Sequence, residues 1–421
     1  MTSADVVGPD RAPPLEEEQL PGGIRGVRDR AWLNVRTGNL GPVPIIVGEI
    51  AVVMIFAFTA TNFFTAVNFV NLIEQTAGTA MLAYGVVFVL LLGEIDLSIG
   101  YLAGIGALVV AELQLPGSKY QMSGLLAMLV AVAVCAAIGG FQGSIVAFVG
   151  VPSFVVTLAG FLIWQGVILN TLEQRGTIII QDRWINYTDL YIFSPLAGWV
   201  IAAIFTALYP LSVVYKKIVA RGTQIAQQSW TSAVLKTIGI GIAAFGTVAI
   251  ANHGKIISTP LGLPLPAVLM VFFLVVLTFL AKWTTFGRHV YAVGGNAEAA
   301  RRAGINVPRI RVLVFALSGA MAAVGGIVFA AQVNSVALTF PPGNLLLNAI
   351  ASAVIGGVSL FGGRGEVRGA LLGALLIGTL QNGLNTLSIS NGWIYIVTGL
   401  VLLGAVTLDT FAVRLQARSG R

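Results

Sequence analysis

The sequence predicts an all-α, polytopic membrane protein with about 12 transmembrane helices, some of them broken or re-entrant. Of its 421 residues, 57% are hydrophobic and only 10% are charged, whereas about 25% of the residues in an ordinary soluble domain are charged. Apolar runs long enough to cross a bilayer core of about 30 Å recur along the chain, separated by short polar breaks. A closed β-barrel is excluded, because it requires alternating apolar and polar residues, and runs such as 267–281 and 394–407 are apolar on every face.

A polar N-terminal segment precedes the first apolar run. Residues 1–42 include the acidic run Glu16–Glu18 and contain no apolar core of a cleavable signal peptide. We therefore expect a disordered cytoplasmic tail at 1–42, a transmembrane domain at 43–411 and a short cytoplasmic tail at 412–421.

Twelve apolar runs make up the predicted transmembrane domain. An even number of spans places both termini on the same side of the membrane. Two connections, 93–96 and 149–151, contain no basic residue, so the charge pattern does not decide whether they are loops or re-entrant segments. The runs cover residues 43–62, 71–92, 97–115, 122–148, 152–170, 192–214, 233–252, 265–282, 309–332, 346–362, 367–387 and 392–411.

The distribution of basic residues predicts the orientation. With both termini cytoplasmic, the inner segments and their flanks hold 20 of the 24 Lys and Arg residues. Only Lys119, Arg175, Arg183 and Lys255 then lie outside. Cytoplasmic loops of membrane proteins carry such an excess, so the net charge of +7 gives no reason to expect a nucleic-acid partner.

The motifs of common enzyme classes are missing from the sequence. There is no Gly-x4-Gly-Lys-Ser/Thr phosphate loop, so we do not expect the chain to hydrolyse ATP itself, and neither HExxH nor GxSxG occurs. The histidines are His253 and His289, both in predicted loops, and the single cysteine, Cys135, excludes disulfides and cysteine-ligated metal sites. We therefore expect no cofactor, no metal and no enzymatic activity.

The longest basic inner loop contains a short helix with well-defined ends. Asn296 is a good N-cap, Glu298 faces the positive helix end, Arg301 and Arg302 lie at the negative end, and Gly304 suits the C′ position. A helix specified in this way can be an ordinary capped linker or a docking site for a cytoplasmic partner. These residue patterns favour neither interpretation over the other.

Four stretches resemble motifs of one transporter family. Residues 287–328 read GRHVYAVGGNAEAARRAGINVPRIRVLVFALSGAMAAVGGIV and resemble the coupling segment of the ribose, galactose and xylose permeases of bacterial ABC importers. Residues 93–100 (GEIDLSIG), 151–160 (VPSFVVTLAG) and 355–365 (IGGVSLFGGRG) resemble further motifs of the family in the same order. The resemblance covers roughly residues 71–409.

The resemblance implies a set of partners and a location. It implies a cytoplasmic ABC ATPase subunit that uses ATP and receives the helix of the coupling loop 283–308, a periplasmic or lipid-anchored sugar-binding protein, a second copy of this chain, and surrounding lipid of the bacterial inner membrane. The residues it assigns to ATPase coupling are Asn296, Ala297, Glu298, Ala299, Ala300, Arg301, Arg302 and Gly304.

Within the family the chain is most similar to the xylose type. Its middle section is longer than in the ribose type, so residues 171–252 are a probable insertion that adds two spans to a 10-helix core. The implied cargo is a monosaccharide, xylose or another pentose. The sequence departs from the family at Leu346, Asn348 and Val358.

An ion-gradient-coupled secondary transporter is the alternative function. It fits the number of spans equally well, but it requires paired carboxylates or histidines deep in the membrane as a relay, and the sequence offers few.

A sugar path needs hydrogen-bonding groups at depth with few fixed charges. Asp96 is the exception among the candidates, because a carboxylate at depth is a functional hypothesis by default; we favour the alternative that it caps a helix beginning at Leu97. The candidates for the substrate pathway are Gln75, Thr76, Asp96, Ser98, Phe154, Thr157, Asn348, Gln381 and Asn382.

Overall fold

The structure, a computed structural model, describes residues 43–219, 230–253, 255–256, 259–260, 262–340 and 344–418. The predicted tail at 1–42 therefore lies outside the described residues. The described chain is helical apart from three antiparallel pairs of very short strands, which confirms the all-α class. The pairs are β1 (Ile178–Ile179) with β6 (Ser335–Val336), β2 (Ile192–Phe193) with β5 (Leu263–Pro264), and β3 (Lys255–Ile256) with β4 (Thr259–Pro260).

Each predicted apolar run contains a helix. Seven helices of the described residues are long and apolar enough to cross a membrane, namely α3, α5 with η2, α6, α8, α9, α10 and α13, and four further apolar helical stretches are shorter. The helices are α2 (Val43–Thr59), α3 (Ala66–Leu91), α4 (Ile99–Leu113), α5 (Gly124–Ser144), the π-helix η2 (Ile145–Val149), α6 (Ser153–Arg175), α7 (Arg183–Leu190), α8 (Pro195–Val219), α9 (Trp230–His253), α10 (Leu265–Trp283), α11 (Thr285–Gly295), α12 (Ala297–Arg302), α13 (Val307–Gln332), α14 (Leu345–Ile355), α15 (Val367–Thr386) and α16 (Asn391–Arg418).

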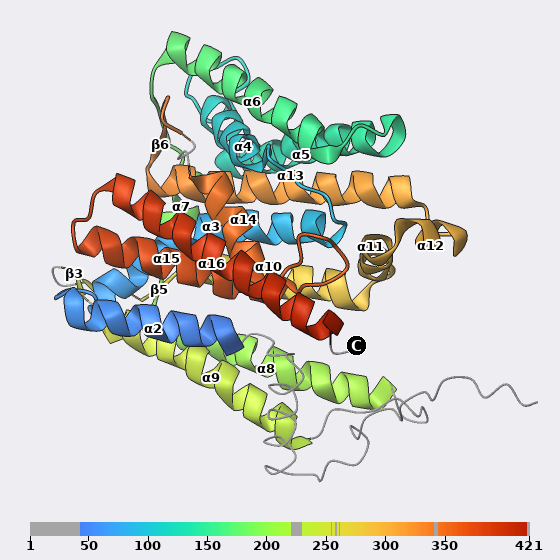
Figure 1. The fold of residues 1–421 in the computed structure, drawn as a ribbon. Helices are drawn as coiled ribbons and strands as arrows, with labels where there is room; N and C mark the ends of the chain where they lie inside the picture. Colours follow the sequence, from blue (N-terminus) through green and yellow to red (C-terminus); the bar gives the residue numbers. More distant parts are fainter. Residues whose placement is uncertain are drawn as a thin grey trace, which may run out of the picture.

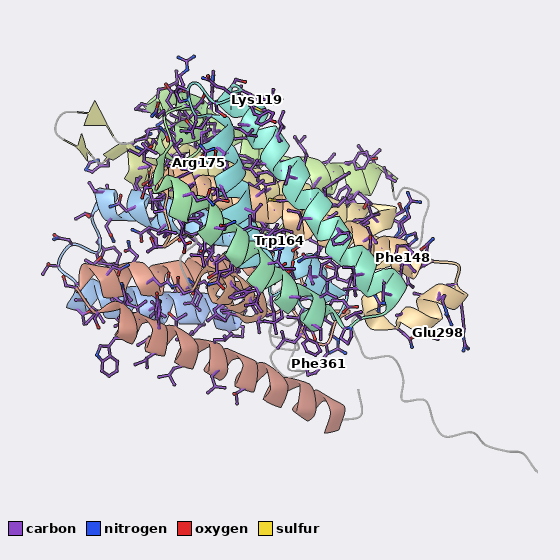
Figure 2. The ribbon with its side chains drawn as sticks, turned by 90° about the horizontal axis from the view of Figure 1, so that it is seen from above. Lys119, Phe148, Trp164, Arg175, Glu298 and Phe361 are labelled. Carbon is purple, nitrogen blue, oxygen red and sulfur yellow. The ribbon has the colours of Figure 1, made fainter. Side chains whose placement is uncertain are left out.

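The two ends of the helix bundle differ. Figure 1 shows α11 and α12 protruding at one end, where α16 also finishes, whereas the strands β3, β5 and β6 lie at the opposite end. We call these the coupling end and the strand end. In Figure 2, Glu298, Phe361 and Phe148 mark the coupling end, and Lys119 and Arg175 mark the strand end.

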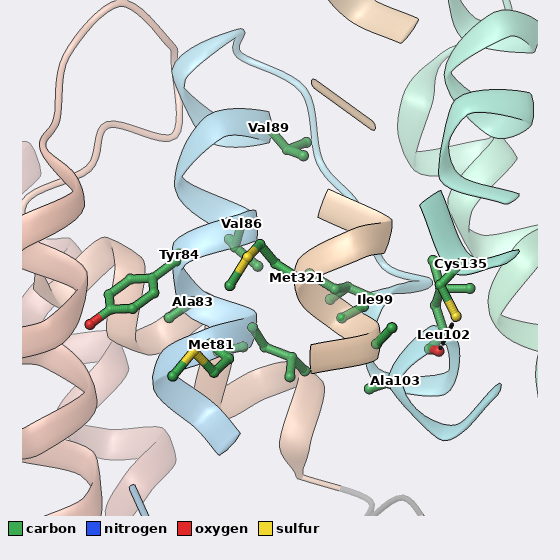
Figure 3. Close-up of a cluster of buried hydrophobic side chains, with 14 of the residues drawn as sticks. Met81, Ala83, Tyr84, Val86, Val89, Ile99, Leu102, Ala103, Cys135 and Met321 are labelled. Carbon is green, nitrogen blue, oxygen red and sulfur yellow. Dashed lines mark hydrogen bonds between the residues drawn. The ribbon is translucent and has the colours of Figure 1, made fainter. Parts of the chain in front are cut away.

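The helices α3 and α13 form the centre of the fold. In α3, 83% of an apolar segment of 18 residues is buried inside the protein, whereas the same share is 17% in α8 and 11% in α9. Figure 3 shows part of this core, where Met321 of α13 lies beside Val86 of α3. Tyr84 points to the other side of α3, and its hydroxyl donates a hydrogen bond to the carbonyl oxygen of Met270 in α10 at 3.1 Å. A membrane helix buried to this extent is surrounded by other helices and not by lipid. The helix α3 can therefore carry polar and small residues that a lipid-facing helix avoids.

Small residues allow α5 and α13 to pack with their backbones in contact. A Cβ added to Gly139 would lie 2.2 Å from the carbonyl oxygen of Phe315, and one added to Gly319 would lie 2.1 Å from that of Cys135. Backbone packing through small residues is the usual means of close helix association in membranes, where helices gain no hydrophobic driving force from each other.

The apolar run 346–362 is not one continuous helix, and its break agrees with the expectation that some helices are broken or re-entrant. Its helix, α14, ends at Ile355, because Gly356 and Gly357 follow and Gly357 has φ of +83°. A helix of 11 residues is about 16 Å long and crosses half of a bilayer core of about 30 Å. The remainder of the apolar run, 356–362, is not helical. It belongs to a glycine-rich connection, 356–366, that leads to α15.

Other predicted boundaries shift by smaller amounts. The helix expected to begin at Leu97 begins at Ile99, and α16 continues through Arg418, into the segment expected to be a tail. Residues 171–252, the expected insertion, contain α7, α8 and most of α9. The two long helices pack against each other and reach α3 and α10 through buried residues near the strand end, namely Val70 with Ala251, and Ala202 with Val248 and Leu263.

Candidate coupling site and substrate-pathway residues

The helix α12 is capped at its N-terminus by the residue that the sequence predicts. The side chain of Asn296 accepts a hydrogen bond from the backbone N–H of Ala299 at 2.9 Å. This bond satisfies one of the N–H groups that the first turn of a helix leaves without a partner. The helix therefore has a fixed starting point in the loop that follows α11.

The C-terminus of α12 is closed by a Schellman motif. The helix ends at Arg302 with Ala303 as its C-cap, one residue earlier than the predicted range 297–303. Gly304, at φ of +83°, donates its N–H to Arg301, and Ile305 donates its N–H to Ala300 at 3.0 Å. These are the two bonds that define the motif, and its αL position favours glycine.

The charged side chains of α12 pair with one another at the surface. Glu298 accepts a hydrogen bond from Arg301 at 3.0 Å and one from Arg302 at 3.2 Å. These hydrogen bonds hold the pKa of the Glu298 carboxyl below its usual value. The side chains of Arg301 and Arg302 are 69% and 79% exposed, so both remain accessible from solvent.

Three chain segments meet through their backbones behind α12. Leu91, the last residue of α3, accepts a hydrogen bond from the N–H of Gly363 at 2.9 Å. A Cβ added to Gly294 of α11 would lie 1.7 Å from the same Leu91 oxygen, and one added to Gly362 would lie 2.8 Å from the Gly294 oxygen and 2.9 Å from the Gly93 nitrogen. We call Leu91, Gly93, Gly294, Gly362 and Gly363 the glycine junction.

The glycine junction connects the coupling loop to two breaks in the bundle. One break lies between α3 and α4, and the other lies between α14 and α15. Both breaks lie in glycine-broken apolar runs around a serine, 93–104 and 356–369. Direct contact between them explains why side chains are excluded at these positions.

Polar side chains reinforce the surroundings of the junction. The hydroxyl of Tyr291 donates a hydrogen bond to the Gly365 carbonyl oxygen at 2.7 Å. Arg311 of α13 pairs with Glu94 at 3.1 Å, with side chains that are 31% and 14% exposed. Both interactions lie at the coupling end, so movement of α11 or α13 is opposed by bonds to the two breaks.

A buried polar cluster lies in the break before α4. The carboxylate of Asp96 accepts hydrogen bonds from the N–H and hydroxyl of Ser98, at 2.9 and 2.7 Å, and from the hydroxyl of Ser318 at 2.9 Å. Ser98 also lies 3.1 Å from the side-chain oxygen of Gln142. Ser318 is about 10 Å along α13 from Arg311, so the cluster lies within the bundle and joins α4, α5 and α13.

Asp96 forms an Asx turn ahead of α4 and is not the expected N-cap of a helix beginning at Leu97, because the N-cap of α4 is Ser98. Its carboxylate binds the N–H of Ser98, the residue that precedes α4, so it stabilises the turn that enters the helix. Every hydrogen bond it accepts comes from a neutral donor, and no basic side chain of the described residues forms an ion pair with it.

The start of α6 is tied to the same break. Thr157, buried, lies with its hydroxyl 3.2 Å from the carbonyl oxygen of Ile95, and Ser153 accepts a hydrogen bond from the Ile95 N–H at 3.2 Å. Phe154, which the sequence placed on the sugar path, is 52% exposed on α6. Phe154 therefore does not share the interior position of Thr157.

A second polar group joins α3 and α15 nearer the strand end. The amide of Asn382 donates to the Gln75 side chain at 3.3 Å and accepts from Asn68 at 2.9 Å. The hydroxyl of Thr76 donates a hydrogen bond to the carbonyl oxygen of Leu72, in the same helix, at 2.7 Å. Most of the predicted pathway residues therefore separate into two groups, around Asp96 and around Asn382, and no side-chain hydrogen bond among the described residues joins the groups.

Two candidate side chains have unused hydrogen-bonding capacity. Asn348 of α14 is 4% exposed, and its side-chain oxygen has no partner among the described residues; the same is true of the side-chain nitrogen of Gln381. A buried polar atom without a partner costs about 1–3 kcal/mol, so such atoms are candidates for binding a passing polar solute or water.

Sequence reasoning missed Gln142, Ser318 and Asn68, which complete the two polar groups. Gln142 is an isolated polar residue in the apolar run 122–148, which was a usable signal. Ser318 had none, because serine is common in closely packed membrane helices. In the described part of the chain no group of three His, Cys, Asp or Glu residues could hold a metal ion.

A bundle of membrane-length helices with a capped, exposed helix at one end defines a class, the multi-pass transport permease. A family model described as "branched-chain amino acid transport system / permease component" matches residues 68–406. The chain belongs to this family of ABC transporter permease subunits. No solved structure matches it.

Curated relatives match nearly the whole chain. It is 33% identical to the xylose transport system permease protein of Haemophilus influenzae over 376 residues, covering 87% of this chain and 96% of that protein. It is 33% identical to the xylose transport system permease protein of Escherichia coli, covering 88% and 92%. It is 32% identical to the ribose import permease protein of Escherichia coli, covering 86% and 92%.

Proposed function

We propose that the chain is the transmembrane subunit of an ATP-driven importer that carries a monosaccharide, xylose or another pentose, across the bacterial cytoplasmic membrane. The observation that carries the proposal is the exposed, capped helix α12, joined through the glycine junction to α3 and to the connection before α15. A linker helix needs no such backbone contact with two breaks in the bundle.

In the proposed mechanism, a separate ATPase pair binds α12 and closes when ATP binds. Movement of α12 passes through α11 and the glycine junction to the two breaks, which alternately open the path to either side. The functional unit contains two copies of this chain, with all termini cytoplasmic. A periplasmic or lipid-anchored binding protein delivers the sugar.

The interior supports a neutral polar cargo. The two polar groups consist of hydroxyl and amide side chains, and Asp96 is the single carboxylate among them. Hydroxyls and amides exchange hydrogen bonds with a sugar at little cost, whereas fixed charges at depth are costly. The names of the relatives support a pentose, since two are xylose permeases and one is a ribose permease.

Co-purification with the ATPase tests the coupling role. The native permease is extracted gently and compared with a variant in which residues 297–303 are replaced by a Gly/Ser linker, and with a control in which 116–122 at the strand end is replaced in the same way. We expect the ATPase to accompany the native chain and the control but to be lost from the 297–303 variant. Failure of any ATPase to bind the native chain would exclude the ABC mechanism here.

Uptake measurements test the energy source and the cargo. Accumulation of labelled xylose should persist when the proton gradient is collapsed and stop when ATP is depleted; the reverse result supports a gradient-coupled transporter. Competition by unlabelled ribose and by a hexose then ranks the cargo.

A further inference from the structure

A cavity of about 690 Å³ opens at the coupling end between the insertion and the core. Its walls come from three parts of the chain: the last turns of α8, the junction of α10 with α11, and the connection before α15. The lining residues are Lys216, Ala281, Lys282, Trp283, Arg288, Tyr291, Gly365 and Glu366.

The cavity lies at the level expected for a membrane surface. Lys216 is about 32 Å along α8 from Pro195, and Lys282 is about 26 Å along α10 from Leu265. Both distances are close to the thickness of a bilayer core of about 30 Å, and both helices start at the strand end. Tyr215 stacks on Trp283 with ring centroids 6.2 Å apart, as expected of an aromatic belt at the headgroup level.

The charge of the cavity is positive and incompletely compensated. The lining contains three cationic side chains and one carboxylate, Glu366. That carboxylate already forms ion pairs with Lys282 and Arg368. Lys216 lies 4.4 Å above the Trp283 ring, and among the described residues no carboxylate forms an ion pair with Lys216 or Arg288.

We propose that this cavity binds the headgroup of an anionic phospholipid, with Lys216 and Arg288 contacting the phosphate and Trp283 packing against the glycerol and upper acyl chains. Basic pockets between helices on the cytoplasmic side are suited to acidic headgroups. A lipid fits better than free phosphate, because the cavity combines cations with the half-buried aromatic side chains of Trp283 and Tyr291 at the depth where headgroup and acyl chain meet.

The site also touches the coupling machinery. Tyr291 binds Gly365, and Gly365 is the neighbour of Glu366 in the connection that follows the glycine junction. A bound headgroup would therefore hold the insertion helix α8 against α11. The inference concerns lipid binding by the permease alone and does not depend on the cargo proposed above.

Binding of a short-chain phosphatidylglycerol tests the proposal. The purified permease in phosphatidylcholine nanodiscs is titrated with this lipid, and bound lipid is counted by native mass spectrometry. Lys216→Gln and Arg288→Gln should each weaken the affinity about fivefold, and the double variant about 25-fold, since each basic residue near an anionic surface contributes about that factor. All these side chains are exposed, so the variants should fold.

For two further variants we expect unchanged lipid affinity in one and stronger lipid binding in the other. Lys217→Gln removes an adjacent cation that lies over Trp230 and does not line the cavity, and it should leave the affinity unchanged. Glu366→Gln frees two cations and should strengthen binding. Equal loss in the Lys217 variant, or unchanged binding in the double variant, would overturn the proposal.

Competition experiments separate the possible occupants. Inorganic phosphate that displaces the lipid at equal concentration would show that the cavity takes a free anion. If the double variant keeps its lipid but no longer co-purifies with the ATPase, the cavity receives an acidic segment of that partner, and the lipid assignment is wrong.

Discussion

Substitution of Gly294 by Ala should uncouple the permease from its ATPase. An added Cβ would lie 1.7 Å from the Leu91 carbonyl oxygen and 2.9 Å from the Gly363 nitrogen. Both atoms belong to the backbone, so no side chain can rotate out of the way. Gly295 is the matched control, because a Cβ there meets nothing within 4 Å.

The size of the effect follows from this overlap. Ordinary contact begins near 3.4 Å, and 3.4 − 1.7 leaves an overlap of about 1.7 Å, so α11 must move by that much or the glycine junction must open. Overpacking of this kind costs about 1–3 kcal/mol. If the penalty applies to the closed junction, its population falls by about 5- to 150-fold. The change is large enough to abolish transmission while the helices still insert.

The assay is sugar-stimulated ATP hydrolysis by the reconstituted importer, together with the melting temperature of the permease. We expect Gly294→Ala to lose most of the stimulation and Gly295→Ala to keep it, with both variants inserted in the membrane. Full stimulation in the Gly294 variant would refute the close packing of α11 on the end of α3.

Three other predictions concern caps and charges. Asn296→Ala should destabilise α12 by about 1 kcal/mol and weaken ATPase co-purification, whereas Asn296→Asp, which retains the acceptor, should not; equal behaviour of both variants would contradict the capping role. Asp96→Asn keeps an oxygen for Ser98 and an amide for Ser318, so transport should largely persist, and complete loss of uptake in a folded complex would assign Asp96 a functional charge. Burial raises the pKa of the Glu366 carboxyl, but hydrogen bonds from Lys282 and Arg368 outweigh this and hold it below its usual value of 4.5. The stabilisation is therefore complete above that value and is lost as the pH falls through the lowered pKa; melting curves from about pH 6 to about pH 3 should show a steeper loss for the native chain than for Glu366→Gln, and parallel curves would argue against the ion pair.

Local signals predicted most of the elements. The N-cap Asn296 and the αL residue Gly304 were readable because capping depends on residues next to each other in sequence. The apolar run 346–362 misled because hydropathy does not register that Gly356 and Gly357 end α14. The number of apolar residues in a run tells whether a helix of that length could span a bilayer. It does not tell where the helix ends.

Contacts between distant segments limited the prediction of the site. Ser318 reaches Asp96 from 222 positions away, and Asn68 reaches Asn382 from 314 positions away. A sequence alone does not show which helices become neighbours, so Phe154 and Thr157, three residues apart, were grouped although one is exposed and the other buried.

The absence of side chains at the glycine junction has a mechanical consequence. Side chains are the compliant part of a protein interior, because they can change rotamer and absorb a displacement before the backbone moves. Where three backbones touch directly, no such slack exists. In the coupling mechanism proposed above, a displacement of α12 by a fraction of an ångström would pass almost undiminished through α11 to α3 and to the segment before α15, and most of the ATPase stroke would reach the membrane interior.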